Sequence, residues 1–389
     1  MPKPEPSTDP SPFAASPRPI AELKDSERVA CLRLIRSQNV GPVTFRELIA
    51  HFGDAETALD AVPDLAQRGG RPISVCSVDA AERELARAQE LGSRALFVME
   101  QDYPTALAAL EAPPPLIYVK GDTGLLHRPI LAIVGSRRCS AAGAKLARQF
   151  ANDISHAGYV IASGLARGID SVAHEASLAK GTVAVLAGGL DVVYPPEHDA
   201  LQRSIGETGA LVSEMPPGFV PRGQDFPRRN RIISGLALGV LVVEAARRSG
   251  SLVTARLANE QGREVFAVPG HPLDPRAEGT NRLLKSGATL VTEPADLLAA
   301  LSPLTRVPNA AMREEPAETA LTGSEGSSPL TQPQRDKVLD ALGPAPIDID
   351  AVVRATGLGT RAVRVALMEL SLAGRLERHG NGLVSLVLA

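Results

Sequence analysis

Aromatic residues and cysteines are scarce in this sequence. Of its 389 residues, 3% are aromatic, none is tryptophan, and three are cysteines. Cys31, Cys76 and Cys139 lie far apart and form no CxxC pair, so the spacing indicates neither a disulfide framework nor a zinc knuckle. The histidines show no ligand spacing with cysteines or carboxylates. We therefore expect no metal site and no cofactor, and the composition fits a reducing compartment.

Long apolar runs and excess charge are also absent. No stretch reaches the ~18 uncharged apolar residues of a membrane span, and the Pro- and Ser-rich residues 1–19 contain no run typical of a signal peptide. We therefore expect a cytoplasmic protein that does not contact a membrane. The 41 Lys and Arg residues are balanced by 44 Asp and Glu residues, which gives a net charge of −3. A nucleic-acid site must then be a local basic patch.

The pattern of apolar residues changes along the chain and indicates separate domains. In the middle, short β-branched runs alternate with amphipathic helical stretches, which is typical of a parallel sheet with crossover helices. Strands are expected at 130–134, 159–162, 183–186, 240–243 and 265–268. The predicted segments are a disordered tail (1–19), a helical domain similar to SAM or helix-hairpin-helix domains (20–72), a Rossmann-like domain (73–300), a linker (301–328) and a winged helix (329–389). The predicted fold class is α/β, with a doubly wound, mostly parallel sheet.

Two loops that follow predicted strands have the composition of phosphate-binding turns. The Gly-Ser-Arg turn at 135–137 precedes a helix that begins near Ala141, where free backbone N–H groups and the helix dipole favour an anion. The loop at 163–170 follows the next strand and again combines glycines, a hydroxyl and an arginine. The alternative for the first loop is a tight strand-to-helix turn with two solvated arginines.

Three side chains near these loops are expected to have structural roles. Asp170 and His174 have helical spacing, and we expect a helix cap and a packing contact rather than acid-base chemistry. Tyr194 belongs to a glycine turn followed by two prolines. It is either a platform for base stacking or, as we favour, a loop anchor.

The segment at 221–231 is the most informative part of the sequence. It holds four arginines against one aspartate, a local charge of +3, together with Phe226. Arginine to neutralise phosphates and an aromatic ring to stack bases are what single-stranded nucleic acid requires. A solvated loop or a subunit contact is the alternative.

Five segments in the same order resemble the motif set of the DprA (Smf) family. They are the turn at 135–137, the loop at 163–170, Phe-Pro-Arg-Arg-Asn-Arg-Ile-Ile-Ser-Gly-Leu at 226–236, Ser-Gly-Ser-Leu-Val-Thr-Ala at 249–255 and Ala-Val-Pro-Gly at 267–270. Each pattern alone is weak, and their order over roughly residues 78–300 carries the resemblance. The sequence departs from the family pattern at His198, where asparagine is frequent, and at Ala237, where serine is common.

The resemblance implies a protein that binds single-stranded DNA in a basic pocket of the Rossmann-like domain and is not an enzyme. It also implies a homodimer that helps to load the recombinase RecA during natural transformation. Motif by motif, it assigns DNA contacts to Arg137, Phe226, Asn230 and Arg231, and to Lys180 before a predicted strand. With the residues indicated by composition, the predicted DNA-binding set is Gly135, Ser136, Arg137, Gly164, Arg167, Lys180, Phe226, Arg228, Asn230 and Arg231.

The two smaller domains leave alternatives open. The Val-Gly-Pro turn at 40–42 can either contact phosphate or be a plain interhelical turn, which we favour. Arg361 and Arg364 lie on one side of the predicted recognition helix and can meet duplex DNA, but winged helices also serve as protein-contact modules. The nearby acidic residues Asp348, Asp350 and Glu369 weaken the DNA interpretation.

The main rival function is a nucleotide-processing phosphoribohydrolase, because this type of Rossmann domain resembles those enzymes. The corresponding stretch at 248–255 has no acidic residue to stabilise an oxocarbenium-like transition state, and Glu244 and Glu260 flank it only at a distance. A dinucleotide-dependent oxidoreductase is weaker still, since the turn at 135–137 is not G-x-G-x-x-G.

Overall fold

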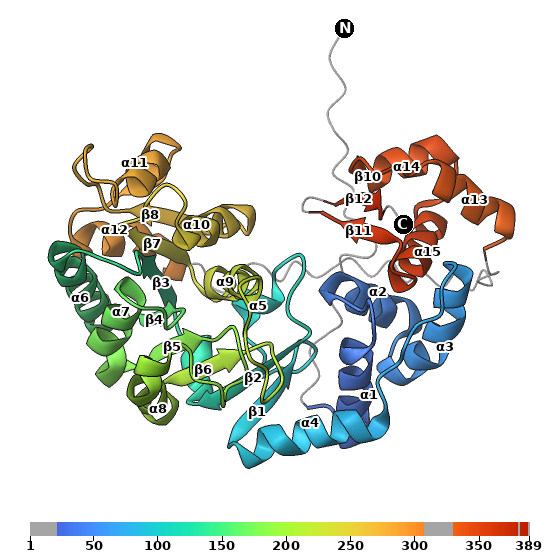
Figure 1. Cartoon of the computed structure of the whole chain (residues 1–389), viewed down its shortest axis with the longest axis horizontal. Coiled ribbons are helices and arrows are strands. Elements are labelled where there is room, and N and C mark those ends of the chain that lie inside the picture. The colour runs from blue at the N-terminus through green and yellow to red at the C-terminus, as the bar shows by residue number, and fades with distance from the viewer. Residues whose placement is uncertain (1–21, 307–329, 380–381, 388–389) are drawn as a thin grey trace, which may run out of the picture. The chain divides into compact units, whose positions relative to one another are not determined.

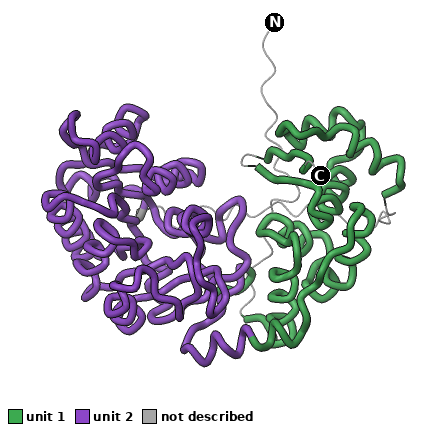
Figure 2. Tube along the Cα trace, viewed as in Figure 1, with its two compact units in different colours: residues 1–83, 99–101, 320–389 green, residues 84–98, 102–319 purple. Residues whose placement is uncertain are grey.

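The computed structural model describes residues 22–306, 330–379 and 382–387, which form two compact units (Figures 1 and 2). One unit contains residues 1–83, 99–101 and 320–389, and the other contains residues 84–98 and 102–319. The predicted tail lies outside the described residues, as does the predicted linker from residue 307 onward. The first residues of that predicted linker continue a helix that ends at Arg306.

The larger unit is built on a nine-stranded sheet with the order β1-β2-β6-β5-β4-β3-β7-β8-β9. Neighbouring strands from β6 to β9 in this order pair in parallel. β2 pairs antiparallel with both β1 and β6. The sheet is therefore mostly parallel, which confirms the prediction. The strands are β1 (Ser93–Phe97), β2 (Leu116–Gly121), β3 (Ile130–Gly135), β4 (Val160–Ser163), β5 (Thr182–Val185), β6 (Ala210–Ser213), β7 (Gly239–Val243), β8 (Glu264–Ala267) and β9 (Thr289–Leu290). From β3 the chain adds β4, β5 and β6 on one side. It then returns to place β7, β8 and β9 on the other side of β3, so the topological switch point lies between β3 and β7.

Helices cover both faces of this sheet. They are α5 (Thr105–Ala108), η1 (Thr123–His127), α6 (Ala141–His156), α7 (Ile169–Ser177), η2 (Leu178–Lys180), η3 (Pro196–His198), α8 (Asp199–Thr208), α9 (Asp225–Leu236), α10 (Gly250–Glu260), α11 (Glu278–Lys285) and α12 (Pro294–Arg306). A further helix, α4 (Val78–Glu90), runs from one unit into the other. Along β3, Ala132 and Val134 face one buried core while Leu131 and Ile133 face the other. Because both faces are buried, the strand is apolar throughout rather than alternating.

The smaller unit contains the predicted helical domain and the predicted winged helix. The helical part consists of α1 (Asp25–Arg36), α2 (Pro42–Phe52) and α3 (Ala55–Arg68), and Gly41 is the N-cap of α2. The winged helix consists of α13 (Gln332–Asp340), β10 (Ile347–Asp348), α14 (Ile349–Thr356), α15 (Thr360–Leu372), β11 (Leu376–Arg378) and β12 (Leu383–Leu386). Its three strands form a separate sheet with the order β10-β12-β11 and cover a core of their own. Among the described helices, none has the length and apolar character to cross a bilayer.

Candidate nucleic-acid interface

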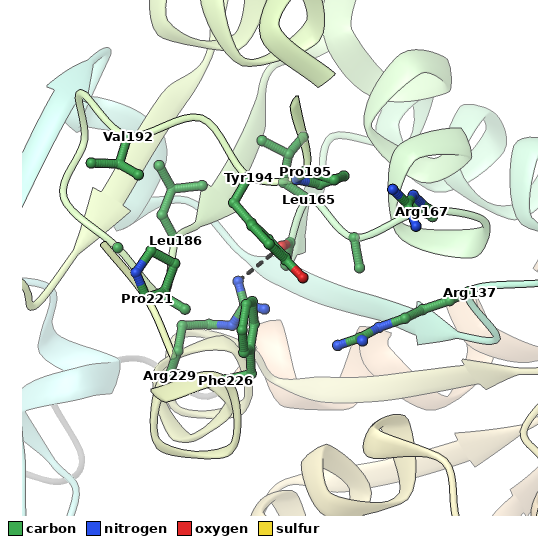
Figure 3. Close-up of a pocket in the computed structure, with 14 residues that line it drawn as sticks. Arg137, Leu165, Arg167, Leu186, Val192, Tyr194, Pro195, Pro221, Phe226 and Arg229 are labelled. Atoms are coloured by element: carbon green, nitrogen blue, oxygen red, sulfur yellow. Dashed lines mark hydrogen bonds between the residues drawn. The ribbon is translucent and has the colours of Figure 1, made fainter. Parts of the chain in front are cut away.

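A groove lies at the carboxyl ends of the central parallel strands in the larger unit. It is lined by the turn after β3, the loop after β4, the first turns of α9 and α10, and Tyr194 from the loop after β5. The groove has a volume of about 690 Å³, and a smaller pocket beside it shares Arg137, Phe226 and Arg229. Ligands of open α/β sheets collect at this edge near the switch point, so the groove is the candidate site. Figure 3 shows the smaller pocket beside it.

The charge of the groove is positive. Its lining contains the side chains of Arg137, Arg138, Arg229 and Arg248, and its one carboxylate is the buried Asp170. Glu244 and Glu260, which flank the sequence segment that resembles a phosphoribohydrolase loop, are not among the lining residues. Among the described residues, no group of three or more His, Cys, Asp or Glu side chains can hold a metal ion. The groove can therefore attract an anion through arginine.

Two aromatic rings stand at the mouth of the smaller pocket. The rings of Tyr194 and Phe226 have centroids 5.0 Å apart with an interplanar angle of 49°. The guanidinium carbon of Arg137 lies 5.7 Å from the centroid of the Phe226 ring, within cation–π range. Figure 3 shows the three side chains converging, Arg137 and Tyr194 from loops and Phe226 from the first turn of α9. Tyr194 is 48% exposed, so its position suits base stacking, the role that we ranked second from sequence.

The turn at 135–137 approaches its neighbours closely. A Cβ at Gly135 would overlap the carbonyl oxygen of Val243, so glycine allows β3 to lie against the end of β7. Ser136 Oγ accepts a hydrogen bond from the backbone N–H of Arg138 at 3.2 Å. The turn therefore presents Arg137 and Arg138 to the groove from a fixed backbone.

The N-terminus of α6, which we expected to favour an external anion, already holds a carboxylate of this chain. Ser140 is the N-cap, and its backbone N–H and hydroxyl both donate to Glu244, at 2.9 and 2.5 Å. Gly143 leaves room for this carboxylate, because a Cβ there would lie 2.5 Å from Glu244 Cδ. Sequence reasoning treated Glu244 only as a flanking residue, whereas its carboxylate accepts the two donors of the N-cap residue and places a negative charge at the start of the helix.

The loop at 163–168 is likewise organised by an internal carboxylate. The backbone N–H groups of Gly164 and Ala166 donate to Asp170 Oδ2 at 3.2 and 3.4 Å. Asp170 thus holds the preceding loop, and Gly168 rather than Asp170 is the N-cap of α7. These backbone donors face a carboxylate of the chain, so the loop contributes side chains to the interface. Burial raises the pKa of Asp170, although the nearby Arg229 guanidinium acts in the opposite direction.

Arg229 is the residue that sequence reasoning missed. Its side chain is buried, and Nη1 donates to the carbonyl oxygens of Gly164, at 2.8 Å, and Val185. Burial lowers the pKa of Arg229 to about 10, so the guanidinium stays charged at neutral pH. Arg229 follows Phe226 by three residues, and residues three apart share one face of a helix. That spacing is the signal that would have placed both in the groove.

Arg228 and Arg231 lie on a different face of α9, where both meet Glu214. Arg231 Nη2 lies 2.6 Å from Glu214 Oε1, and Arg231 Nη1 donates to the carbonyl oxygen of Ala112 at 3.3 Å. Arg228 Nε lies 3.5 Å from Glu214 Oε2. Neither arginine lines the groove, whereas Asn230 does. This geometry gives Arg231 a structural role, and DNA contact at Arg228 and Arg231 stays a prediction.

Arg167 and Lys180 have contrasting positions. Arg167 is exposed, lines the smaller pocket and pairs with Glu197. Its hydrogen bond lowers the pKa of Glu197 to about 2. Lys180 ends η2 just before β5, so it lies at the amino ends of the parallel strands, at the opposite edge of the sheet from the groove. It lines neither cavity, and its contact with DNA also stays a prediction.

Together, the switch-point groove, its arginines and its paired rings define a Rossmann-like protein with a basic, aromatic-edged binding site. The family model described as DNA recombination-mediator protein A matches residues 94–302. Models of the DprA-like N-terminal HHH domain and the DprA winged helix domain match residues 25–87 and 322–382. The chain belongs to the DprA (Smf) family.

Individual relatives agree with this assignment. Protein Smf of Escherichia coli is 44% identical over 288 residues, which are 73% of this chain and 75% of that protein. DNA processing protein DprA of Streptococcus pneumoniae is 46% identical over 204 residues, 52% and 72% of the two chains. The X-ray structure of that DprA superimposes with a TM-score of 0.55 at 36% identity, covering 66% of this chain and 86% of the other. A structure described as showing the single-stranded DNA binding mode of Helicobacter pylori DprA has a TM-score of 0.50 at 32% identity, covering 54% and 96%.

Proposed function

We propose that this protein binds single-stranded DNA in the groove at the carboxyl ends of its parallel strands, and that it acts by binding rather than by catalysis. The observation that carries the proposal is the meeting of Arg137, Tyr194 and Phe226 beside a groove with several arginines and one buried carboxylate. Arginines neutralise phosphates of any sequence, and each stacked base contributes ~1–3 kcal/mol. The arrangement therefore favours a flexible single strand whose bases can leave their stack.

We assign separate roles to the predicted residues from their places in the groove and in the smaller pocket. We infer phosphate contacts for Ser136, Arg137 and Arg167, base stacking for Phe226 and Tyr194, and a polar contact for Asn230. Gly135 and Gly164 shape the backbone, because a Cβ at Gly164 would lie 2.6 Å from Arg229 Nη2. A single strand of DNA that also contacted Lys180, Arg228 or Arg231 would have to extend beyond the groove.

The experiment that tests the proposal is fluorescence anisotropy with a labelled oligonucleotide, as a single strand and as a duplex, at two salt concentrations. We expect preference for the single strand and weaker binding at higher salt. Phe226→Ala should weaken binding by a free energy of ~1–3 kcal/mol with little change in salt dependence, and Arg137→Ala should also reduce the salt dependence. Arg203→Ala, an exposed arginine paired with Asp199 on α8, is the matched control. Normal binding by both groove variants would contradict the proposal.

Family membership supports a further step in the same function. We infer that the protein, as a cytoplasmic homodimer, delivers single-stranded DNA to the recombinase RecA during recombination and natural transformation. The measurement is RecA ATPase activity on single-stranded DNA coated with single-stranded-DNA-binding protein, with and without this chain. Stimulation that the Arg137→Ala variant fails to produce would support loading through the groove. DNA binding without stimulation would leave the binding function standing and remove the loading step.

A further inference from the structure

In the smaller unit, α15 of the winged helix is buried on two sides. One side, including Val363, Leu367 and Leu370, belongs to the core of the winged helix itself. The other side presents Met368 and Leu372, which are 2% and 0% exposed but lie outside that core cluster. α15 packs against α3 and α2 of the helical domain as well as against α14. The helical domain therefore covers the outer face of this helix.

A glycine makes this close approach possible. Gly69, the C-cap of α3, would as alanine place its Cβ into the carbonyl oxygen of Glu369 and 2.9 Å from Ala373 Cβ. Its φ of −70° is one that any residue adopts. The helical domain alone therefore does not require glycine here, and the contact with α15 does.

Polar contacts join the same two surfaces. Asn39 Nδ2 donates to the carbonyl oxygen of Leu372 at 2.9 Å, and Arg375 Nη1 donates to that of Gly69 at 3.1 Å. Arg378 pairs with Glu47 at 2.6 Å, and the two side chains are only 18% and 15% exposed. The winged helix thus contacts Asn39, the residue next to the turn that precedes α2.

Basic residues on and beside the covered face of α15 match those of a DNA-binding winged helix, and of these Arg361 is itself exposed. In such domains the recognition helix enters the major groove with its N-terminal residues at the bases, as helix-turn-helix proteins do. Here Arg361 and Arg364 occupy the N-terminal half of α15, and Arg375 and Arg378 follow it. Glu47 of α2 interacts electrostatically with both Arg364 and Arg378. Its carboxylate occupies the position among these arginines that a DNA phosphate would take.

We propose that the helical domain masks a duplex-DNA-binding face of the winged helix, formed by α15 and the arginines of 375–378. Glu47 and a phosphate compete for the same guanidinium groups, so duplex DNA binds this face only in molecules whose two domains have separated. The apparent affinity for duplex DNA is then reduced by the fraction of open molecules. This masking does not involve the proposed single-stranded DNA site of the larger unit.

The test compares two glycine variants of the full chain. Gly69→Ala forces α3 and α15 apart, whereas Gly41→Ala, in the same domain, adds a Cβ with nothing within 4 Å. In fluorescence anisotropy with duplex DNA, we expect Gly69→Ala to bind about tenfold more tightly than the wild type, within the usual range of coupling between two states. Gly41→Ala should match the wild type. Adding Arg364→Ala and Arg378→Ala to the Gly69→Ala chain should abolish the gain, and single-stranded DNA binding should stay unchanged throughout.

Amide hydrogen exchange over residues 366–373 reports whether the domains have separated, independently of DNA. Glu47→Gln removes the competing charge without a steric clash, and Glu56→Gln, at an exposed position of α3, is its control. Faster exchange together with tighter duplex binding supports the proposal. Faster exchange with unchanged duplex binding would show that the covered face does not bind DNA. Unchanged exchange in both Gly69→Ala and Glu47→Gln would show that these contacts do not hold the domains together, and would equally overturn it.

Discussion

Arg229 shows how a single buried charge can shape a binding site. Its guanidinium donates hydrogen bonds to the carbonyl oxygens of Gly164, just after β4, and Val185, at the end of β5. Asp170 lies close enough to affect the pKa of Arg229. The sequence segment around Arg229 led us to predict a basic patch. It could not show which arginines turn inward, because that depends on where α9 begins and which face it buries. Arg228 and Arg229 are neighbours in sequence, yet only Arg229 lines the groove.

Replacing Arg229 should cost both stability and binding. Arg229→Ala removes the donor to the buried carbonyl oxygens of Gly164 and Val185, and leaving a buried polar group unpaired typically costs ~1–3 kcal/mol of unfolding free energy. Urea denaturation should show this loss, and single-stranded DNA binding should fall as the loop at 163–168 shifts. Arg228→Ala, whose side chain is 52% exposed, should change stability by less than ~1 kcal/mol. Equal stability of the two variants would contradict the role assigned to Arg229.

His174 should make stability fall in acid. The ring is fully buried, and Nδ1 lies 2.8 Å from Thr182 Oγ1, which itself donates to the carbonyl oxygen of Ile161. Burial, with a smaller effect from Arg229, lowers the pKa of His174 from 6.5 to about 3. Between these pH values the unfolded chain binds a proton that the folded chain does not, so stability is lost as pH falls below 6.5.

The expected slope for His174 is at most ~1.4 kcal/mol per pH unit. Urea midpoints measured from pH 7 to pH 4 for the wild type and His174→Gln isolate this contribution, because Asp170 and the other groups titrate in both proteins. A smaller acid loss in His174→Gln is the predicted result. Parallel curves would mean that His174 is protonated alike in the folded and unfolded chains.

At the level of elements, the strands were predicted more accurately than the loops. The five expected strands agree with β3, β4, β5, β7 and β8 to within one residue at each end, because continuous β-branched runs mark strands buried on both faces. The loops after β3 and β4 were also found, but their backbone donors meet Glu244 and Asp170. Glu244 lies 104 positions from Ser140 and leaves no local pattern, which is why it escaped prediction. Asp170 lies only four to six residues from its donors, and the sequence analysis assigned it to a helix cap instead.

The junction of the two loops depends on Gly168, the N-cap of α7. Its φ is +77°, and a Cβ would overlap the carbonyl oxygen of Ser136 in the neighbouring loop. Gly168→Ala should therefore lower the unfolding free energy by more than the ~1–2 kcal/mol of a left-handed alanine alone, and should weaken DNA binding. Gly158→Ala, with φ +99° and nothing within 4 Å, carries the backbone penalty only. Similar urea midpoints for the two variants would exclude a steric role for Gly168.

For the whole molecule, the net charge of −3 hides a locally positive site. Arg137, Arg138 and Arg248 line the groove without the deep burial of Arg229. If these three arginines and Arg167 each neutralise one phosphate of a single strand, the logarithm of the binding constant should fall with the logarithm of salt concentration with a slope of about −3. Titrations at four or more salt concentrations measure it. A slope near zero would mean that binding does not depend on these arginines.

The domain plan was predictable from sequence, but the pairing of domains was not. Helical periodicity at both ends indicated a small helical domain and a winged helix, and the structure confirms both. Their packing in one unit joins residues more than 300 positions apart, such as Asn39 and Leu372. Gly69 and Gly374, which accommodate this contact, each look like an ordinary helix-terminal glycine until the partner surface is known.

The carboxylate of Glu244 at the start of α6 also bears on competition inside a cell. In nucleotide-binding Rossmann domains the first crossover helix receives a pyrophosphate, whereas here Ser140 and Gly143 are fitted to an acidic side chain of the chain itself. We therefore expect ATP and nicotinamide dinucleotides to bind poorly at the start of α6. A free nucleotide would then compete with DNA only through the arginines of the groove.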